Sequence, residues 1–476
     1  MKLNYSGFLL LALLAGCARF EPKPVSPAQT AAGLEARRLD DPAFQEFLAR
    51  NLPAGSVERG ARTWSFEMLN LAALYYHPSL EVARAEWQVA LGGQITAAQR
   101  PNPTLTATPG YDFNPVGQLS PWLPLTFIDW PIETMGKRGY RKAQAEALSH
   151  SARLNISVTA WQVRANLRAC LTDYSAARRR EELLAKQLAL QEKIATALDQ
   201  QFQAGAIARS ELGLVRIALE KLRLDLNDTR QQQADARVRV ADAVGIPVKA
   251  LDGLEFTDDL QTTGAGGQEP VSASIRDRAL QSRADVLAAL AEYAASQSAL
   301  QLEIARQYPD LHLGPGYQFD HGEHTFSLQL TAELPLLNQN QGPIAEAKAR
   351  RAAAAARFLA VQARVITEID RALAGYRVAR DNLAAIESLA AAQQRQAAAV
   401  QALAREGEAA PVDLLNTQLE LGAGELTLLD ARVKILRSVA ALEDALQQPL
   451  ELMKPALFEQ SPGAQAAVQN NSNKKQ

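Results

Sequence analysis

The stretch Pro109–Asn114 reads PGYDFN, and about 200 residues later Pro315–Asp320 reads PGYQFD. Residues on either side of the two stretches correspond as well, in the same order. The further matches are Pro103 with Pro309, Leu105 with Leu311, Asp129–Ile132 (DWPI) with Glu333–Leu336 (ELPL), Gly205 with Gly407, and Glu211 with Asp413. Because these residues match in the same order across a whole unit, the chain is predicted to be a duplicated unit, with a first repeat at 64–244 and a second at 272–447.

Each repeat is predicted to contain a pair of strands. The expected strands are 104–114, 123–132, 311–320 and 325–334. Three of them alternate strictly between apolar and polar residues, whereas the second, which is rich in Trp and Phe, alternates poorly. Each has about 10 residues, the length that a tilted strand needs to cross a bilayer, with aromatic residues where an interfacial girdle would lie. The alternative is a soluble sheet that covers the helices.

Each repeat is also predicted to have a short helix before its strands and a long helical hairpin after them. High Ala, Leu, Arg, Gln and Glu content, with Gly and Pro mostly at the ends, supports these helices. They are 80–99 and 284–307, followed by hairpins at 138–244 and 343–447. The first helix of each hairpin is roughly 100 Å long. We expect the two shorter helices of a repeat to stack end to end beside it. A cytosolic coiled coil is the alternative, and the strands argue against it.

Four strands cannot close a barrel. An open sheet edge in hydrocarbon would leave backbone N–H and C=O groups without partners. Three copies would supply twelve strands, and the closed barrel would continue as a tube of twelve helical rods. The predicted fold class is therefore mainly α with a transmembrane β-barrel portion, in which a trimer forms a 12-stranded β-barrel continued by a 12-helix α-barrel.

The N-terminus has the pattern of a lipoprotein signal peptide. Lys2 precedes an apolar run from Gly7 to Ala15, and Leu-Ala-Gly stands directly before Cys17. Residues 1–16 are therefore the predicted signal peptide, and the Cys17 thiol is the expected attachment point of a diacylglycerol. An ordinary signal peptide with an incidental cysteine is the alternative. Ala18 agrees with sorting to the outer membrane of a Gram-negative bacterium, with the protein extending into the periplasm.

The composition is that of an ordinary folded protein. The 476 residues include 47% hydrophobic and 21% charged residues, with a net charge of −2. Because the charges are interspersed, no nucleic-acid partner is expected. No stretch after the signal peptide approaches the ~20 consecutive apolar residues of a membrane helix. The remaining segments are expected to form an equatorial belt around the tube: an extended N-terminal segment at 17–63, a linker at 245–271, and 448–476, which ends in a disordered tail.

The sequence resembles the TolC-type outer-membrane factor family over essentially the whole mature chain. The matching pieces are the turns at Gly205 and Gly407 and the runs Trp130–Arg138 and Leu334–Pro343. These two runs look most like the heavy-metal branch, the outer factors of cobalt-zinc-cadmium or copper-silver pumps. The resemblance implies a homotrimer in outer-membrane lipid that works with a periplasmic adaptor (membrane fusion protein) and an inner-membrane RND transporter.

The same resemblance implies a channel gate at the periplasmic tip. The segment that matches the gate carries Glu406, Glu408 and Asp413, and Asn416 stands where the family has a second aspartate. Threefold symmetry would turn each carboxylate into a ring that attracts cations and repels anions. The alternative is that acidic residues at a helix N-terminus simply favour the helix dipole.

The other tip turn is expected to contact the adaptor. It contains Gly205, Arg209, Ser210 and Glu211, and Gly407 is the matching glycine of the gate hairpin. Pure turn chemistry is the alternative, because glycine relieves strain at a chain reversal.

No enzyme chemistry, cofactor or metal site is expected. The sequence contains no nucleophile elbow, phosphate loop or zinc-hydrolase motif. His321 and His324 could grip a divalent cation weakly, but polar loop residues are the simpler explanation. The predicted function is a passive exit duct for heavy-metal cations. The alternatives are a duct for drugs or solvents, type I secretion, and a lipid-anchored periplasmic scaffold without a pore.

Overall fold

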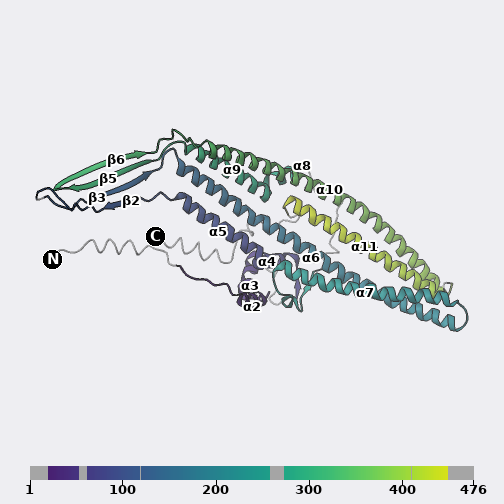
Figure 1. Ribbon diagram of the computed structural model, residues 1–476. Helices are drawn as coiled ribbons and strands as arrows, with labels where there is room; N and C mark the ends of the chain where they lie inside the picture. The colour runs from purple at the N-terminus through teal and green to yellow at the C-terminus, as the bar shows by residue number, and fades with distance from the viewer. Residues whose placement is uncertain (1–19, 53–61, 118, 258–272, 409, 449–476) are drawn as a thin grey trace.

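The chain is elongated, with a sheet at one end and two helical hairpins reaching toward the other (Figure 1). The computed structural model describes residues 20–52, 62–117, 119–257, 273–408 and 410–448. The predicted signal peptide, Cys17, residues 258–272 and the C-terminal tail from 449 lie outside the described residues. None of the described helices combines the length and hydropathy that a membrane-spanning helix needs.

The helices form two parallel sets, one from each repeat. In each set two shorter helices pack end to end along one long helix, as predicted (Figure 1). The central helix is α6, which packs against α5 and α7 of its own repeat and against α9 and α11 of the other. The bounds are α5 Pro78–Ala98, α6 Lys137–Gln203, α7 Arg209–Val244, α9 Ala284–Ala305, α10 Gln341–Glu406 and α11 Pro411–Leu446.

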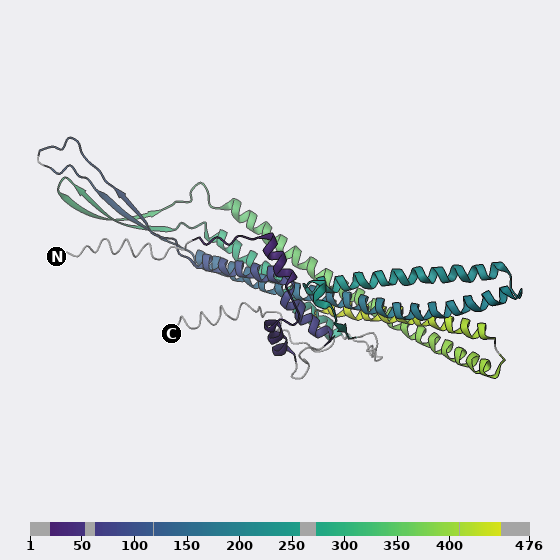
Figure 2. The same cartoon turned by 90° about the horizontal axis from the view of Figure 1, so that it is seen from below.

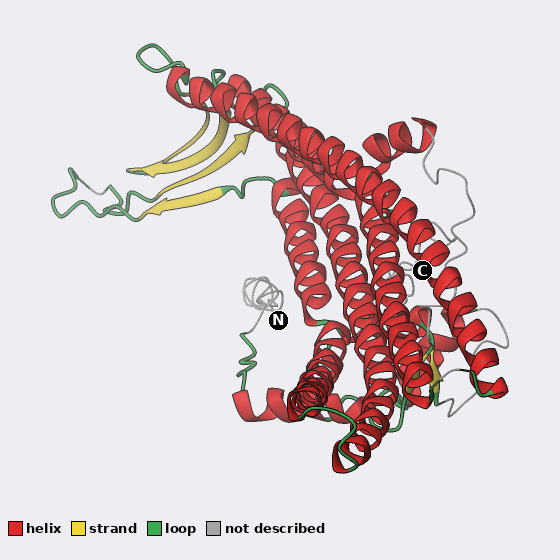
Figure 3. Ribbon diagram, turned by 90° about the vertical axis from the view of Figure 1, so that its right-hand side faces the viewer, coloured by secondary structure: helices red, strands yellow, loops and turns green. Residues whose placement is uncertain are grey.

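The four long strands form one antiparallel sheet in the order β2-β3-β5-β6. The two central strands come from different repeats, so the pairing of β3 with β5 joins the repeats. In Figure 3 the sheet projects from one end of the helices. The bounds are β2 Thr104–Thr108, β3 Leu125–Ile132, β5 Leu311–Asp320 and β6 Glu323–Ala332.

Three predicted strands differ from the observed ones. The second was expected over 123–132 but begins at Leu125, directly after Pro124, which has no N–H for the ladder. The first was expected to run over 104–114 but ends at Thr108, and beyond it only the bridge between Tyr111 and Trp122 is formed. Pro109 follows directly, and proline has no N–H to continue the ladder. The fourth strand is observed at 323–332 and not at 325–334, because the Gly322 turn is tight enough for pairing to begin at Glu323.

The N-terminal segment was expected to be extended, and this was wrong for much of its length. It contains α2 (Pro27–Glu35) and α3 (Pro42–Asn51), each with a proline in its first turn. The Asp41 side chain caps α3 by accepting hydrogen bonds from the Ala43 and Phe44 amides. The sequence signals for a helix were therefore present, but they were short and separated.

Small elements, called here the belt, pack beside the middle of the long helices. The largest hydrophobic core lies here, and its fully buried side chains include Phe44, Leu69, Leu167 and Val240 from four different elements. A smaller core occupies the matching place in the second repeat. The remaining elements of the belt are β1 Thr63–Trp64, α4 Phe66–Tyr76, η1 Val248–Leu251, β4 Glu255–Phe256, which pairs in parallel with β1, and α8 Ala273–Ser282.

Candidate functional site: the sheet and the hairpin ends

One face of the sheet is apolar and exposed. Leu105 on β2, Trp130 on β3, and Leu328 and Leu330 on β6 are 56–70% exposed. Antiparallel register places apolar residues of neighbouring strands directly opposite one another, as with Leu313 and Leu330. A large continuous apolar face on a folded chain marks a surface that contacts lipid or another protein.

The opposite face of the sheet explains the poor alternation of the second strand. Phe127 lies on this otherwise polar face and covers Gly314, where an added Cβ would be 2.0 Å from the ring atom Cζ. Beside it, His312 Nδ1 is 2.9 Å from a carboxylate oxygen of Asp129. Phe127 therefore fills the space left by glycine on the neighbouring strand, and Ile128 and Trp130 still point to the apolar face.

Both outer strands of the sheet have an open edge. β2 pairs only with β3, and β6 pairs only with β5. The backbone N–H and C=O groups along the other side of each strand have no strand partner among the described residues. Such edges are ready to pair with another strand.

A charged joint connects the sheet to the helices. Lys137, at the start of α6, donates to the Tyr308 carbonyl at 2.7 Å and to the Asp310 carboxylate at 2.8 Å. The Thr134 amide also donates to Asp310 at 2.9 Å. Burial opposes ionisation, but these hydrogen bonds lower the pKa of Asp310 below its usual value. Lys137 lies in the Trp130–Arg138 run, but its partner Asp310 could not be predicted from that run, because the two residues lie in different repeats.

Ion pairs hold the two hairpins together along α6 and α11. Arg164 and Glu443 are buried and 2.9 Å apart, while Arg437 contacts Asp173 at 2.5 Å nearer the hairpin ends. The exposed pair Arg180–Asp430 is the next one along.

A further contact between the hairpins involves a glycine of α11. Gln187 of α6 packs on Gly422 of α11, where an added Cβ would lie 3.0 Å from its Nε2. Toward their ends the α6–α7 hairpin and the α10–α11 hairpin diverge (Figure 2).

Both hairpins turn at a glycine with positive φ. Gly205 has φ +74° and Gly407 has φ +80°, a region that other residues rarely adopt. The turns are closed by similar backbone bonds, from Ala206 N to Gln201 O and from Glu408 N to Leu403 O, each 2.9 Å long. The two predicted tip segments therefore have matching geometry, as the duplication implies.

The predicted gate residues lie together at the end of the second hairpin. Asp413 and Asn416 are exposed on α11 and three residues apart, so they share one side of the helix. Glu406 and Glu408 flank the glycine turn and are also exposed. Within the described part of the chain, no side chain pairs with the Asp413 carboxylate. Asp413 occupies the first turn of α11, so an effect on the helix dipole is present whatever else it does.

The predicted adaptor contact lies at the end of the first hairpin. Arg209, Ser210 and Glu211 form the exposed first turn of α7, beside Gly205. Glu211 is the counterpart of Asp413 in the repeat and likewise stands in a first turn. The two hairpin ends therefore carry equivalent residues, and only their place in an assembly could give them different roles.

The histidine-containing loop at the far end of the sheet joins its two hairpins. His321 contacts Asp320 at 2.5 Å and Asp112 of the neighbouring loop at 3.3 Å, and these carboxylates raise the pKa of its imidazole. His324 instead contacts the Tyr317 hydroxyl at 2.8 Å. Among the residues that the structure describes, no three His, Cys, Asp or Glu side chains are arranged to hold a metal ion.

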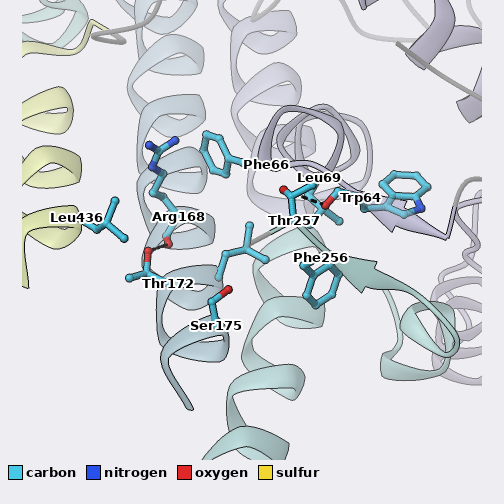
Figure 4. Close-up of a pocket in the computed structure, with 10 residues that line it drawn as sticks. Trp64, Phe66, Leu69, Arg168, Thr172, Ser175, Phe256, Thr257 and Leu436 are labelled. Carbon is cyan, nitrogen blue, oxygen red and sulfur yellow. Dashed lines mark hydrogen bonds between the residues drawn. The ribbon is translucent and has the colours of Figure 1, made fainter. Parts of the chain in front are cut away.

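A small recess in the belt is a packing junction. Its wall comes from α4, β4, α6 and α11 (Figure 4). The Thr172 hydroxyl donates to the Arg168 carbonyl at 2.8 Å, and the Arg168 guanidinium lies 4.5 Å from the Phe66 ring centre. Because these polar groups are already engaged locally, the recess presents no catalytic arrangement.

Comparisons with known proteins agree with this architecture. A family profile described as outer membrane efflux protein matches residues 275–447. A comparison with curated proteins found no match. The matched residues cover the second repeat.

Several solved structures share the fold over most of the chain. The outer-membrane channel OprN is 18% identical with a TM-score of 0.65, covering 92% of this chain and 99% of its own. VceC, an outer membrane protein of Vibrio cholerae, is 17% identical with a TM-score of 0.65 and coverages of 81% and 97%. CusC, whose structures concern transmembrane channel formation, is 16% identical with a TM-score of 0.62 and coverages of 83% and 96%. Residues 275–447 thus match the outer membrane efflux protein profile, and the chain as a whole shares the fold of these solved outer-membrane channels.

Proposed function

We propose that three copies of this chain close into the exit duct of a tripartite RND-type efflux system. The observation that carries the proposal is a sheet with an exposed apolar face and two open edges. In hydrocarbon every backbone polar group needs a partner, so four strands with two open edges must join further strands. Three copies give twelve strands, an even number with no edge left over.

The helices would continue the duct into the periplasm. The exposed flank of α10 and the matching flank of α5 and α7 then meet between copies, and the hairpin ends form the periplasmic tip. There Asp413 and its two symmetry mates face the lumen as a ring of carboxylates, with Asn416, Glu406 and Glu408 close by. A negative ring concentrates cations at a narrow opening. The outer tip turn, with Gly205, Arg209, Ser210 and Glu211, would contact the adaptor.

Two finer parts of the proposal rest on sequence alone. A diacylglycerol on Cys17 would anchor each copy to the outer membrane. Heavy-metal cations are the proposed cargo, supported by the resemblance of Trp130–Arg138 to the metal-exporting branch and consistent with an acidic tip. Cargo choice would come mainly from the inner-membrane transporter, with which the duct works through the adaptor.

The first test is conductance. Protein purified from the outer-membrane fraction should have the mass of a trimer in detergent and should give discrete, cation-preferring conductance steps in planar bilayers. A monomer that gives no steps would support the lipid-anchored scaffold and refute the duct.

The second test concerns the cargo. Deleting the gene should reduce tolerance to zinc, cobalt, cadmium, copper or silver, while tolerance to a drug panel stays the same. An unchanged metal profile with increased drug sensitivity would reject metal export and leave the duct in place.

A further inference from the structure

We infer that the strand joint between two copies, with β6 of one beside β2 of the next, repeats the β3–β5 joint between the two halves of one chain. The strand register of this joint is defined. In this register Leu334 and Leu336, which follow β6, lie opposite Ala107 and Leu105 on β2 of the next copy. The inference rests on the proposed function, because it requires a second copy of the chain beside the first.

The register inside each repeat shows which residues correspond. Leu105 lies opposite Ile128 in the β2–β3 hairpin, and Leu311 lies opposite Ala332 in the β5–β6 hairpin. The sequence match of Leu105 with Leu311 and of the DWPI and ELPL runs places Ile128 at Ala332. Sequence and structure therefore give the same correspondence, and the two hairpins have the same register.

The joint between the halves then predicts the joint between copies. In the β3–β5 pairing, Trp130 lies opposite Leu313 and Ile132 lies opposite Leu311. Replacing each residue by its counterpart in the other repeat gives Leu334 opposite Ala107, and Leu336 opposite Leu105. In one chain these residues lie at the two outer edges of the sheet, so only neighbouring copies can bring them together.

Exposure in the single chain agrees with this assignment. Leu334 and Leu336 are 70% and 78% exposed, and Leu105 is 66% exposed. Burying such side chains removes apolar surface from water, which stabilises the contact. The three leucines therefore have a physical reason to meet a partner.

The polarity of the strands provides an independent check. The same register continues to place Tyr111 opposite Leu330 and Phe113 opposite Leu328, so apolar residues face apolar residues along the joint. A slip of one residue would put Thr106 or Thr108 opposite Leu334 and reverse the two faces. Since polarity was not used to derive the register, its agreement supports this pairing over the two nearest alternatives.

The foot of the sheet predicts how the joints differ in strength. Within one chain, Lys137 binds the Asp310 carboxylate and the Tyr308 carbonyl. The counterparts across the joint are Gln341 in place of Lys137, Thr104 in place of Asp310, and Asn102 in place of Tyr308. All three are exposed in the single chain. Neutral hydrogen bonds are roughly half as strong as charge-assisted ones. The joint between copies should therefore be weaker at this point than the joint between the two halves of one chain.

Cysteine pairs test the register directly. The buried free thiol of Cys170 is first removed by Cys170→Ser in the full-length chain. In that background the double variant Ala107→Cys/Leu334→Cys should form disulfides between copies under mild oxidation. Directly opposite residues have Cβ atoms about 4.5–5.5 Å apart, close to disulfide reach. A covalent trimer should then appear on a denaturing gel without reductant. Pairing Leu334→Cys with Thr106→Cys or Thr108→Cys should lower the yield several-fold, because those side chains point to the other face.

The duplicated chain supplies a matched control. Trp130→Cys/Leu313→Cys is the equivalent pair inside one chain, and it should form a disulfide that leaves the chain monomeric on the same gel. Each single variant should keep the trimer mass in detergent, which shows that it folds.

Each outcome separates the register from the duct. Links at Thr106 or Thr108 in place of Ala107 would overturn the register while the trimer stands. A trimer in which none of the three pairs links would also overturn it and would leave the proposed function intact. A monomeric mass for the unmodified chain would remove the second copy and refute both.

Discussion

The buried ion pair between α6 and α11 should carry much of the contact between the two repeats. Arg164 is 5% exposed and Glu443 is 2% exposed, and the guanidinium also lies 5.0 Å from the Phe66 ring centre and 5.2 Å from that of Trp161. Replacing Glu443 by Gln keeps the shape but leaves a buried positive charge without its counter-charge. Breaking a buried pair in this way costs about 3–5 kcal/mol. We expect the low end, because the amide oxygen can still accept a hydrogen bond.

The exposed pair on the same two helices provides the control. Arg180 and Asp430 have side chains that are 37% and 60% exposed. Asp430→Asn should therefore cost only about 0–1 kcal/mol. The double variant Arg164→Met/Glu443→Leu removes both buried charges and should be at least as stable as the unmodified chain, since apolar replacement of a buried pair is often neutral or stabilising.

Urea unfolding in detergent, followed by tryptophan fluorescence, measures these differences. Trp161 lies next to the pair, so its emission should report the separation of α6 from its surroundings. A role for the unpaired charge is refuted if Glu443→Gln costs no more than Asp430→Asn. It is also refuted if the double variant is as unstable as Glu443→Gln, because the loss would then come from shape and not from an unpaired charge.

Three further predictions follow from other contacts. Burial opposes ionisation of Asp285, but hydrogen bonds from Arg283 lower its pKa below the usual 3.8. The ionised carboxylate therefore adds to the free energy of unfolding above pH 3.8, and this stability is lost as the pH falls through the lowered pKa. Asp285→Asn should cost about 1–3 kcal/mol at pH 7 and clearly less at pH 3; an equal loss at both pH values in urea titrations would contradict this. Gly314→Ala should cost about 1–3 kcal/mol because its Cβ meets Phe127, and Phe127→Leu should recover most of that loss in the same titration. Asp413→Ala should raise the conductance of the resting channel and weaken its cation preference in bilayers, and unchanged values would reject its assignment to the gate.

The duplication made the large elements predictable from sequence. Long runs of helix-forming residues with glycine at 205 and 407 gave the hairpins to within a few residues. The same counting predicted that shorter helices stack along the long ones, because their lengths match. These features depend on local composition and length, which a sequence shows directly.

Features that depend on a distant partner could not be predicted. Phe127 disturbed the alternation of its strand because it covers Gly314, about 190 residues away in sequence. Lys137 is buried against Asp310 for a similar reason. The belt helix α3 is short and depends on burying Phe44 and Leu48 in a core built from several segments. In each case the tertiary neighbour decides the role of the residue.

The divergence of the two hairpins beyond the level of the Gln187–Gly422 contact has a mechanical consequence, because the hairpin ends stand apart (Figure 2). Each hairpin end is a cantilever whose free length, from that level to the glycine turn, is about 20–30 Å at 1.5 Å per residue. Bending such a length to a radius of 60–100 Å, which ordinary helices reach without breaking hydrogen bonds, displaces its end by about 2–7 Å. Elastic bending alone can therefore widen or narrow the space between hairpin ends, with every helical turn intact and the ion pairs farther back still formed.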